Sequence, residues 1–328
     1  MNYRILGKTG FEISEISLGT WQVGGKWGDE FSHQNAEKIL GTAVDSGINF
    51  IDTADVYGNG ESEKAVGRFV KTRFERIYVA TKCGRQLNPH INQSYQPAVL
   101  RKFVEDSLKN MGLETLDLIQ LHCPPTEVYY RPEIFELFDR LKDEGKILNL
   151  GISVEKVEEA LKGIEFENVT SVQIIFNMFR QRPAELFFEQ AKKKNIGIIV
   201  RVPLASGLLT GKFSSNSTFT AGDHRNFNRN GEMFDKGETF SGIDYETGLA
   251  TVEELKAIFP NYQNLAPIAL KWILMYEEVS TIIPGASNPE QAKANLDALS
   301  IENLTSEQIS QVKAVYEKYI KKSVHHLW

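Results

Sequence analysis

The sequence predicts a (β/α)8 TIM barrel, and three observations carry that prediction. Short apolar runs recur along the chain, each followed by helical periodicity, which is the pattern of parallel strands joined by helical crossovers. Eight such runs are present, the number of strands in this barrel. An open doubly wound sheet that binds a nucleotide would instead need GxGxxG after its first strand, where residues 19–25 read GTWQVGG. We therefore expect a single barrel domain over residues 1–328, since one such domain commonly exceeds about 250 residues.

The expected strands are the apolar runs themselves, at 16–19, 49–52, 77–81, 116–122, 147–153, 171–176, 196–202 and 279–284. Apolar residues at spacings of three and four form one helical stripe between the third and fourth strands: Val99, Leu100, Phe103, Val104, Leu108 and Met111. The same spacing recurs between the fifth and sixth strands, at Val157, Ala160, Leu161 and Ile164. Residues 184–194 link the sixth and seventh strands, so each crossover suits a βαβ unit.

Three segments lie outside the repeat. Residues 3–14 contain a turn at 7–10 and predict an N-terminal β-hairpin, and residues 306–321 predict an amphipathic helix near the C-terminal end. The long loop after the seventh strand, about residues 211–248, is rich in Gly, Asn and Phe and precedes a helix at 265–275. Connections of that length are usually lids or binding loops, so we expect this insert to border a site.

Composition narrows the kinds of partner. The formal net charge is −6 and the basic residues are scattered, so no nucleic-acid partner is expected. No apolar run approaches the roughly 20 residues that span a bilayer, and the first residues do not form a signal peptide, so no membrane association is expected. Two cysteines are too few for a disulfide scaffold. These features predict a cytoplasmic protein with a small-molecule partner, and the oligomeric state stays open.

Four ionisable side chains are expected at one rim of the barrel. Asp52 ends the second strand, Tyr57 lies in the loop after it, Lys82 follows the third strand and His122 ends the fourth. Each has an ordinary structural explanation when taken alone, such as a turn cap, a half-buried ring, a solvated cation or a core histidine. Because TIM-barrel active sites form at the C-terminal ends of strands, their joint placement predicts a catalytic site.

The chemistry of this set is that of carbonyl reduction. A carbonyl group that accepts hydride needs a proton as its oxygen becomes an alkoxide, and Tyr57 can donate one. A free tyrosine has a pKa of about 10, so a neighbouring cation such as Lys82 is needed to favour the phenolate. Asp52 would hold Lys82 charged and oriented, and His122 could donate a hydrogen bond to the substrate oxygen. A metal ion is not expected in this site.

From about residue 4 to residue 299 the chain resembles the aldo-keto reductases. The segment GINFIDTADVYGNGESEKAVG resembles the family's block with the catalytic aspartate and tyrosine, VATKCG carries its lysine, and DLIQLHCPP carries its histidine. The resemblance implies a nicotinamide dinucleotide bound across the barrel mouth, and it assigns the catalytic roles to Asp52, Tyr57, Lys82 and His122. It implies substrate contacts for Trp21, Tyr57 and His122.

The same resemblance implies the cofactor-binding residues. Ser153 and Gln173 would bind the nicotinamide carboxamide, although capping a helix and burial on a strand are the ordinary alternatives for them. VPLASGLLTGKF resembles the segment around the pyrophosphate, and IPGASNPEQAKANLDAL resembles the adenosine-binding block. The full expected set is Thr20, Trp21, Asp52, Ser153, Gln173, Arg201, Pro203, Leu204, Ser206, Gly207, Leu208, Lys212, Gly285, Ser287, Gln291 and Asn295.

The chain departs from the family pattern on the cofactor side. Val154 stands where many members have Asn, and Arg201 stands where an aromatic ring often stacks on the nicotinamide, so either guanidinium stacking or a salt bridge is open for Arg201. Many NADP-preferring relatives have Lys or Arg near Ser287 and Gln291, and such cations are missing here. NADP is still favoured, because family members commonly use it and because three features could hold an anion: the helix start after Asn288, Lys212 and the arginines of the lid. NAD is left open.

The predicted function is reduction of a small aldehyde, ketone or open-chain sugar by NADPH, with Tyr57 as general acid. The first alternative is an NAD(P)-dependent sugar or polyol dehydrogenase, because the same four residues serve the reverse reaction. A second alternative is a cofactor-sensing regulatory subunit, since potassium-channel β subunits resemble the same family and keep the site.

Overall fold

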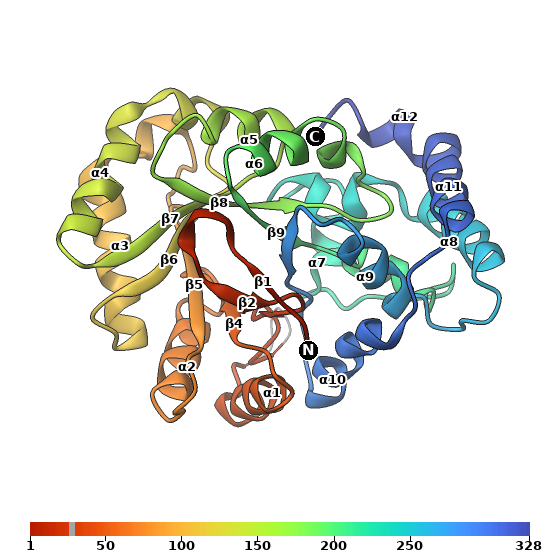
Figure 1. The fold of residues 1–328 in the computed structure, drawn as a ribbon, viewed down its shortest axis with the longest axis horizontal. Coiled ribbons are helices and arrows are strands. Elements are labelled where there is room, and N and C mark those ends of the chain that lie inside the picture. Colours follow the sequence, from red (N-terminus) through yellow and green to blue (C-terminus); the bar gives the residue numbers. More distant parts are fainter. Residues whose placement is uncertain (26–29) are drawn as a thin grey trace.

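A computed structural model of the chain describes residues 1–25 and 30–328. In this part of the chain, eight parallel strands form one sheet in the order β10-β9-β8-β7-β6-β5-β4-β3, so every strand lies beside its neighbour in sequence (Figure 1). Their bounds are β3 Leu18–Gly19, β4 Phe50–Asp52, β5 Tyr78–Cys83, β6 Leu116–His122, β7 Ile147–Ser153, β8 Val169–Ile175, β9 Gly197–Arg201 and β10 Val279–Ile282.

Parallel bridges close the sheet between its first and last strands. Ile16 pairs with Ile282 and Gly19 with Gly285, and the backbone N–H of Ser17 donates to the carbonyl of Ile282 at 2.8 Å. Closure into a barrel satisfies the backbone groups that an open sheet would leave at its edges. The predicted (β/α)8 barrel is therefore confirmed, with eight strands at the predicted positions to within a few residues.

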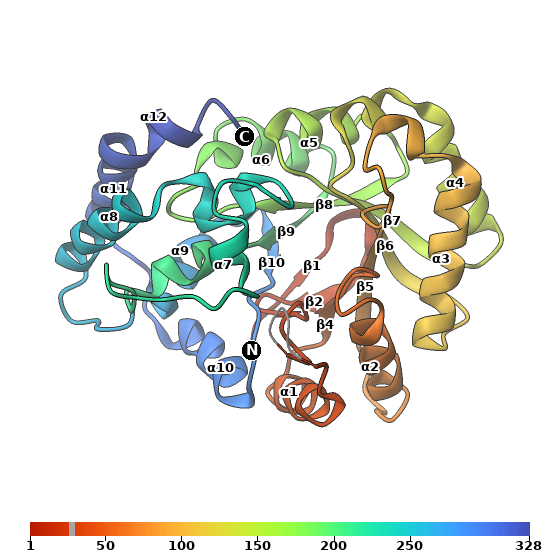
Figure 2. The same cartoon turned by 180° about the vertical axis from the view of Figure 1, so that it is seen from behind.

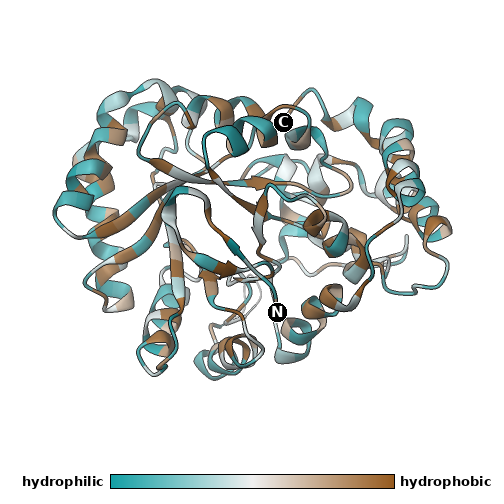
Figure 3. Cartoon of the chain, in the orientation of Figure 1, coloured by the Kyte–Doolittle hydropathy of each residue, from teal (hydrophilic) through white to brown (hydrophobic). Residues whose placement is uncertain are grey.

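Helices form the outer layer, and α1 contacts both α2 and α10, so this layer also closes (Figure 1). Its members are α1 His33–Asp45, α2 Glu61–Val70, α3 Pro97–Met111, α4 Pro132–Asp143, α5 Val157–Gly163, α6 Phe187–Lys193, α9 Ala266–Leu274 and α10 Pro289–Asn295. Figure 3 shows hydrophilic and hydrophobic residues on the same helices, as expected for amphipathic helices between a sheet and solvent. The predicted crossover of residues 184–194 contains α6, which follows a short 3-10 turn at Arg182–Ala184.

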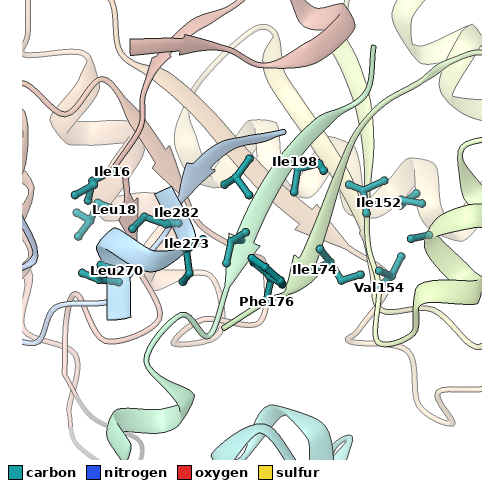
Figure 4. Packing of buried hydrophobic residues seen from close by; sticks show 14 of the residues in the cluster. Ile16, Leu18, Ile152, Val154, Ile174, Phe176, Ile198, Leu270, Ile273 and Ile282 are labelled. Carbon is teal, nitrogen blue, oxygen red and sulfur yellow. The ribbon is translucent and has the colours of Figure 1, made fainter. Parts of the chain in front are cut away.

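Branched apolar side chains on the outer face of the strands form the largest part of the core. Ile152, Ile174 and Ile198 project from β7, β8 and β9, while Leu270 and Ile273 of α9 lie against the last strands (Figure 4). All five are at most 1% exposed. The alternation of the strand therefore leaves the opposite, inward-facing positions for other chemistry.

The predicted N-terminal hairpin is confirmed as β1 Tyr3–Ile5 paired antiparallel with β2 Glu12–Ser14. Its turn, η1 Gly7–Thr9, contacts β8 and β9, and a Cβ on Gly7 would lie 2.1 Å from the backbone nitrogen of Gly197, which begins β9. The hairpin therefore covers the end of the barrel at which strands begin. Leu6 and Ile13 from this hairpin join the inward-facing apolar residues of the strands in a separate small cluster.

The insert of 211–248 is partly helical. It contains α7 His224–Phe227, and its last residues begin α8 Tyr245–Ile258, a helix that was not predicted (Figure 2). The predicted helix of 306–321 is α11 Ser306–Val315, continued by a π-helical turn Tyr316–Ile320 and α12 Lys321–Val324. Among the described residues, every helix is too short or too polar to span a lipid bilayer.

The tail after α12 is fixed to the insert. The indole Nε1 of Trp328 donates to Asp235 Oδ1 at 2.9 Å, and the guanidinium of Arg180 lies 4.4 Å from the centre of the Trp328 ring. A Cβ on Gly237 or Gly242 would lie within 2.8 Å of that ring. The tail and the insert therefore form one packed wall rather than two free loops.

Candidate active site

The inward face of the barrel changes from apolar to polar along each strand. Phe50, Ala80 and Leu118 belong to the small cluster next to the hairpin. Two residues further along the same strands stand Asp52, Lys82 and Gln120, and residues two apart on a strand face the same side. The polar residues therefore lie inside the barrel toward the ends of the strands, as predicted for an active site.

Lys82 is the centre of a buried hydrogen-bonded group. Its Nζ donates to Asp52 Oδ1 at 2.5 Å, to the carbonyl of Thr53 at 2.8 Å and to the hydroxyl oxygen of Tyr57 at 3.5 Å. The Lys82 and Asp52 side chains are only 1% and 2% exposed. Burial acts to lower the pKa of Lys82, but Asp52 and then Tyr57 act in the opposite direction, and the net pKa is raised. A buried ammonium group therefore faces the Tyr57 hydroxyl.

Two amide side chains complete the contacts of Asp52. Gln120 Nε2 donates to Asp52 Oδ2 at 3.0 Å, and Gln173 Nε2 donates to the same oxygen at 2.8 Å. Gln120 was not among the predicted site residues. The sequence could have indicated Gln120, because it lies two residues before His122 on the same strand, and both side chains therefore face the inside of the barrel.

His122 is buried beside Tyr57, with 6.2 Å between the centres of the two rings. Loss of hydration is the largest cause that moves the pKa of His122 well below its usual value, and Arg85 and Lys82 act in the same direction. The imidazole is therefore neutral at neutral pH and carries one N–H. Among the described residues its Nδ1 has no hydrogen-bond partner.

Burial also governs Tyr57. Loss of hydration is the largest cause that raises the pKa of Tyr57 above its usual value, and Lys82 opposes it. The hydroxyl is therefore protonated at neutral pH. It can act as a proton donor, and the nearby ammonium can stabilise the phenolate that remains.

A cavity of about 900 Å³ opens over this group. Asp52, Tyr57 and His122 line it, whereas Lys82 lies behind them. Most of the predicted cofactor residues line it as well: Thr20, Trp21, Asp52, Gln173, Arg201, Pro203, Leu204, Ser206, Gly207, Lys212, Gly285, Gln291 and Asn295.

Three predicted cofactor residues do not line the cavity. Ser153 is fully buried, and its hydroxyl lies 3.5 Å from the sulfur of Cys123. It does not cap the next helix, whose N-cap is Lys156. The Leu208 side chain packs in the core, 1% exposed, so only its backbone could face a ligand. The Ser287 hydroxyl bonds to Gln291 Oε1 at 2.9 Å instead.

The shape of the cavity suits an extended dinucleotide. It runs from Tyr57 and His122 to Gly285 and Asn295, which follow the last strand. Along its wall the turn η5 Ala205–Thr210 has left-handed backbone at Ala205, Ser206 and Gly207. The N–H groups of Ala205 and Gly207 donate to the carbonyls of Val202 and Leu204, so this segment forms a compact turn in the cavity wall.

The end of the cavity beside α10, where the sequence predicts the adenosine site, carries little positive charge. Asn288 caps α10 by accepting from the Gln291 N–H at 2.8 Å, and Gln291 in turn accepts from the Ser287 N–H. Five basic side chains line the cavity: Arg85, Lys156, Arg201, Lys212 and Arg225. Among the described residues the three arginines are in ion pairs, Arg225 with Asp223 at 2.6 Å, whereas Lys156 and Lys212 are in none. Of these two lysines, Lys212 follows the turn η5, and Lys156 is the N-cap of α5. Discrimination in favour of a 2′-phosphate would therefore depend mainly on Lys212.

Four charged side chains form a closed ring in the cavity wall, which we call the charged ring: Arg85, Glu155, Arg201 and Glu238. Arg85 pairs with Glu238 at 2.7 Å, Glu238 with Arg201 at 3.1 Å, Arg201 with Glu155 at 2.8 Å, and Glu155 with Arg85 at 3.9 Å. The salt-bridge alternative for Arg201 is thus the observed one. The other three were missed, because they come from separate loops and the insert.

The surroundings of Val154 account for the absence of an asparagine at this position. Val154 is fully buried among the outward-facing apolar residues next to Ile174 (Figure 4). An amide at this position would enter an apolar layer without a partner, which costs free energy.

Comparison with known proteins agrees with this geometry. The Aldo/keto reductase family model matches residues 15–317. An aldo-keto reductase of Bacillus subtilis (strain 168) is 31% identical over 332 residues, covering 99% of this chain and 96% of that protein. The NADH-specific methylglyoxal reductase of Escherichia coli (strain K12) is 27% identical over 333 residues, covering 95% and 97%. The solved glycerol dehydrogenase of Gluconobacter oxydans has a TM-score of 0.76 at 28% identity, covering 97% and 96%.

Proposed function

Because this chain belongs to the aldo/keto reductase family, we propose that it reduces a small aldehyde, ketone or open-chain sugar with NADPH, using Tyr57 as general acid. The observation that carries the proposal is the contact of one buried ammonium, Lys82, with both Asp52 and the Tyr57 hydroxyl beside a large cavity. The family's enzymes are NAD(P)-dependent oxidoreductases, and this arrangement supplies the proton that such a reduction requires.

Proton transfer follows from the positions of the four side chains. NADPH, when bound, would supply a hydride to the carbonyl carbon, and the electron pair of the C=O bond moves to oxygen. The Tyr57 hydroxyl gives its proton to that oxygen and becomes a phenolate beside Lys82. The carboxylate of Asp52, held by three donors, keeps Lys82 in position.

His122 orients the substrate rather than supplying the proton. Its neutral imidazole lies next to Tyr57 at the cavity surface and can donate its one N–H to the carbonyl oxygen. A donor aimed at the developing negative charge stabilises the transition state more than the ground state.

NADPH is the proposed reductant on the basis of family habit and the cations Lys212 and Arg225 in the cavity wall. The uncharged Ser287 and Gln291 at the adenosine end weaken that preference, and a similar protein is named for NADH specificity. The reverse reaction, oxidation of a polyol, is the second candidate, because a structurally similar protein is a glycerol dehydrogenase.

Replacement of Tyr57 by Phe tests the proposal directly. Tyr57→Phe removes only the phenolic oxygen, so the kcat for aldehyde reduction should fall by about 100-fold or more. The Kd of NADPH, measured by fluorescence quenching, should stay within about twofold. Tyr78→Phe, at a half-buried ring stacked on Phe11, is the matched control and should retain normal kcat. Near-normal turnover by Tyr57→Phe would end the proposal.

A further inference from the structure

The charged ring borders the proposed reaction centre. Cys123 follows His122 directly, and its sulfur lies within 4.8 Å of carboxylate oxygens of Glu155 and Glu238. Arg201 Nη2 lies 3.5 Å from the same sulfur. Glu238 and Arg201 also act electrostatically on Tyr57. A carbonyl compound that contacts Tyr57 and His122 would therefore extend its next atoms toward this ring.

All four members of the ring line the cavity, and their side chains are only 9–19% exposed. They offer guanidinium donors and carboxylate acceptors side by side. Two polar atoms of the ring, Glu155 Oε1 and Arg201 Nε, are buried without a hydrogen-bond partner among the described residues. These two atoms are closed to solvent, so a ligand in the cavity would contact the other guanidinium nitrogens and carboxyl oxygens of the ring.

A hydroxyl group matches this surface better than an ion does. A hydroxyl can donate to a carboxylate and accept from a guanidinium at once. A metal cation would be repelled by Arg85 and Arg201, which already pair with the carboxylates, although Cys123, Glu155 and Glu238 lie close enough to act as ligands. Burial raises the pKa of Glu155 to about 8, so near neutral pH its carboxyl group can also donate a hydrogen bond, and an anionic substituent would meet the negative charge of Glu238 beside the two guanidinium groups.

We propose that the charged ring is a subsite for a hydroxyl group close to the reacting carbonyl, so that the substrates are small hydroxyaldehydes and hydroxyketones. This inference rests on the proposed carbonyl reduction and narrows its substrate class. In the reverse direction the same subsite would select polyols over simple alcohols. Arg85, Glu155, Arg201 and Glu238 are then specificity residues, while Tyr57 remains the acid.

Glyceraldehyde and propanal form the test pair, because both have three carbons and they differ by two hydroxyl groups. For the wild-type protein with NADPH, kcat/KM should favour glyceraldehyde by at least about tenfold, since sites that bond a hydroxyl strongly reject analogues without it. Concentrations are corrected for aldehyde hydration by proton NMR. Equal values would overturn the subsite while leaving the reductase proposal standing, whereas no turnover of either aldehyde would count against the reductase proposal itself.

The double variant Arg85→Met/Glu155→Met tests the residues. It removes the Arg85 guanidinium and the Glu155 carboxyl group and leaves the Arg201–Glu238 ion pair in place. The kcat/KM for glyceraldehyde should fall at least about tenfold more than that for propanal. Arg101→Met/Glu144→Met removes an exposed ion pair from the helical layer and should leave the ratio unchanged.

A loss that is equal for the two aldehydes would assign the ring a structural role and overturn the subsite. Folding of each variant is checked by its Tm and by the Kd of NADPH. If the double variant does not fold, Glu238→Gln provides the same comparison, because it changes one carboxylate to a neutral amide of the same shape.

Discussion

Asp52 is the residue that joins the catalytic group to the predicted cofactor site. Its Oδ1 accepts from Lys82, and its Oδ2 accepts from both Gln120 and Gln173. Gln173 Nε2 also lies 3.2 Å from Gln120 Oε1, so its N–H groups are engaged while its own carbonyl oxygen remains an acceptor. A nicotinamide carboxamide could therefore donate to Gln173 without breaking the contact to Asp52. Gln173 can therefore orient both Asp52 and the cofactor.

The pH dependence of the reaction follows from Tyr57. The acid form is present below the pKa of Tyr57 and is lost as pH rises through it, and burial raises that pKa above its usual value. The single-turnover rate of reduction should therefore be constant through neutral pH and fall at alkaline pH. Rates are measured between about pH 6 and pH 11, spanning the usual tyrosine pKa. The oxidation of the product alcohol should show the opposite slope, because the phenolate is then the base. A reduction rate that increases with pH would rule out Tyr57 as the donor.

At the scale of the elements, apolar runs predicted strands well because these strands are buried on both faces over most of their length. β6 and β7 have the predicted bounds, 116–122 and 147–153. β10 ends at Ile282, two residues before the predicted 284, because Ile283 and Pro284 continue as cavity wall. α8 was missed since its apolar residues are diluted by Gly248 and threonines. Sequence periodicity therefore locates the barrel but not the elements of the insert.

Two helical glycines make a matched test of how the helices pack. A Cβ on Gly67 in α2 would lie 2.2 Å from the backbone oxygen of Met111 at the end of α3. The clash is with backbone, so one helix would have to shift to relieve it. Gly67→Ala should therefore destabilise the fold by about 1–3 kcal/mol. A Cβ on Gly41 in α1 would meet nothing closer than Phe69 at 4.0 Å. Gly41→Ala should stabilise by up to about 1 kcal/mol, because alanine is the better helix former.

Differential scanning calorimetry gives the two glycine variants opposite shifts of Tm, each of a few degrees for about 1 kcal/mol in a domain of this size. A lower Tm for Gly41→Ala, or an unchanged Tm for Gly67→Ala, would contradict the close approach of α2 to α3 and the free space beside α1.

At the scale of the whole molecule, the site combines parts that local sequence cannot bring together. The gathering of Asp52, Tyr57, Lys82 and His122 at one rim could be predicted, because each stands at the end of an apolar strand or in the loop after it, and barrel topology brings strand ends together. The charged ring could not, because Glu238 lies in the insert and its approach to Arg85 and Arg201 depends on how the insert folds back. The hydrogen bond from Trp328 to Asp235 could not be predicted either, because it joins positions 93 residues apart.

Cofactor preference is a property of the whole cavity and can be measured through stability. A ligand that binds only the folded state raises the free energy of unfolding, by about 2.7 kcal/mol when its concentration is about 100 times its Kd. At equal concentrations NADPH should therefore raise the Tm more than NADH does. Lys212→Gln should reduce the NADPH shift toward the NADH value while leaving the NADH shift unchanged, because Lys212 lines the cavity next to the turn η5 and is in no ion pair with an acidic side chain of the described residues. Equal shifts by both dinucleotides in the unmodified protein would instead show that Ser287 and Gln291 make the adenosine end indifferent to the 2′-phosphate.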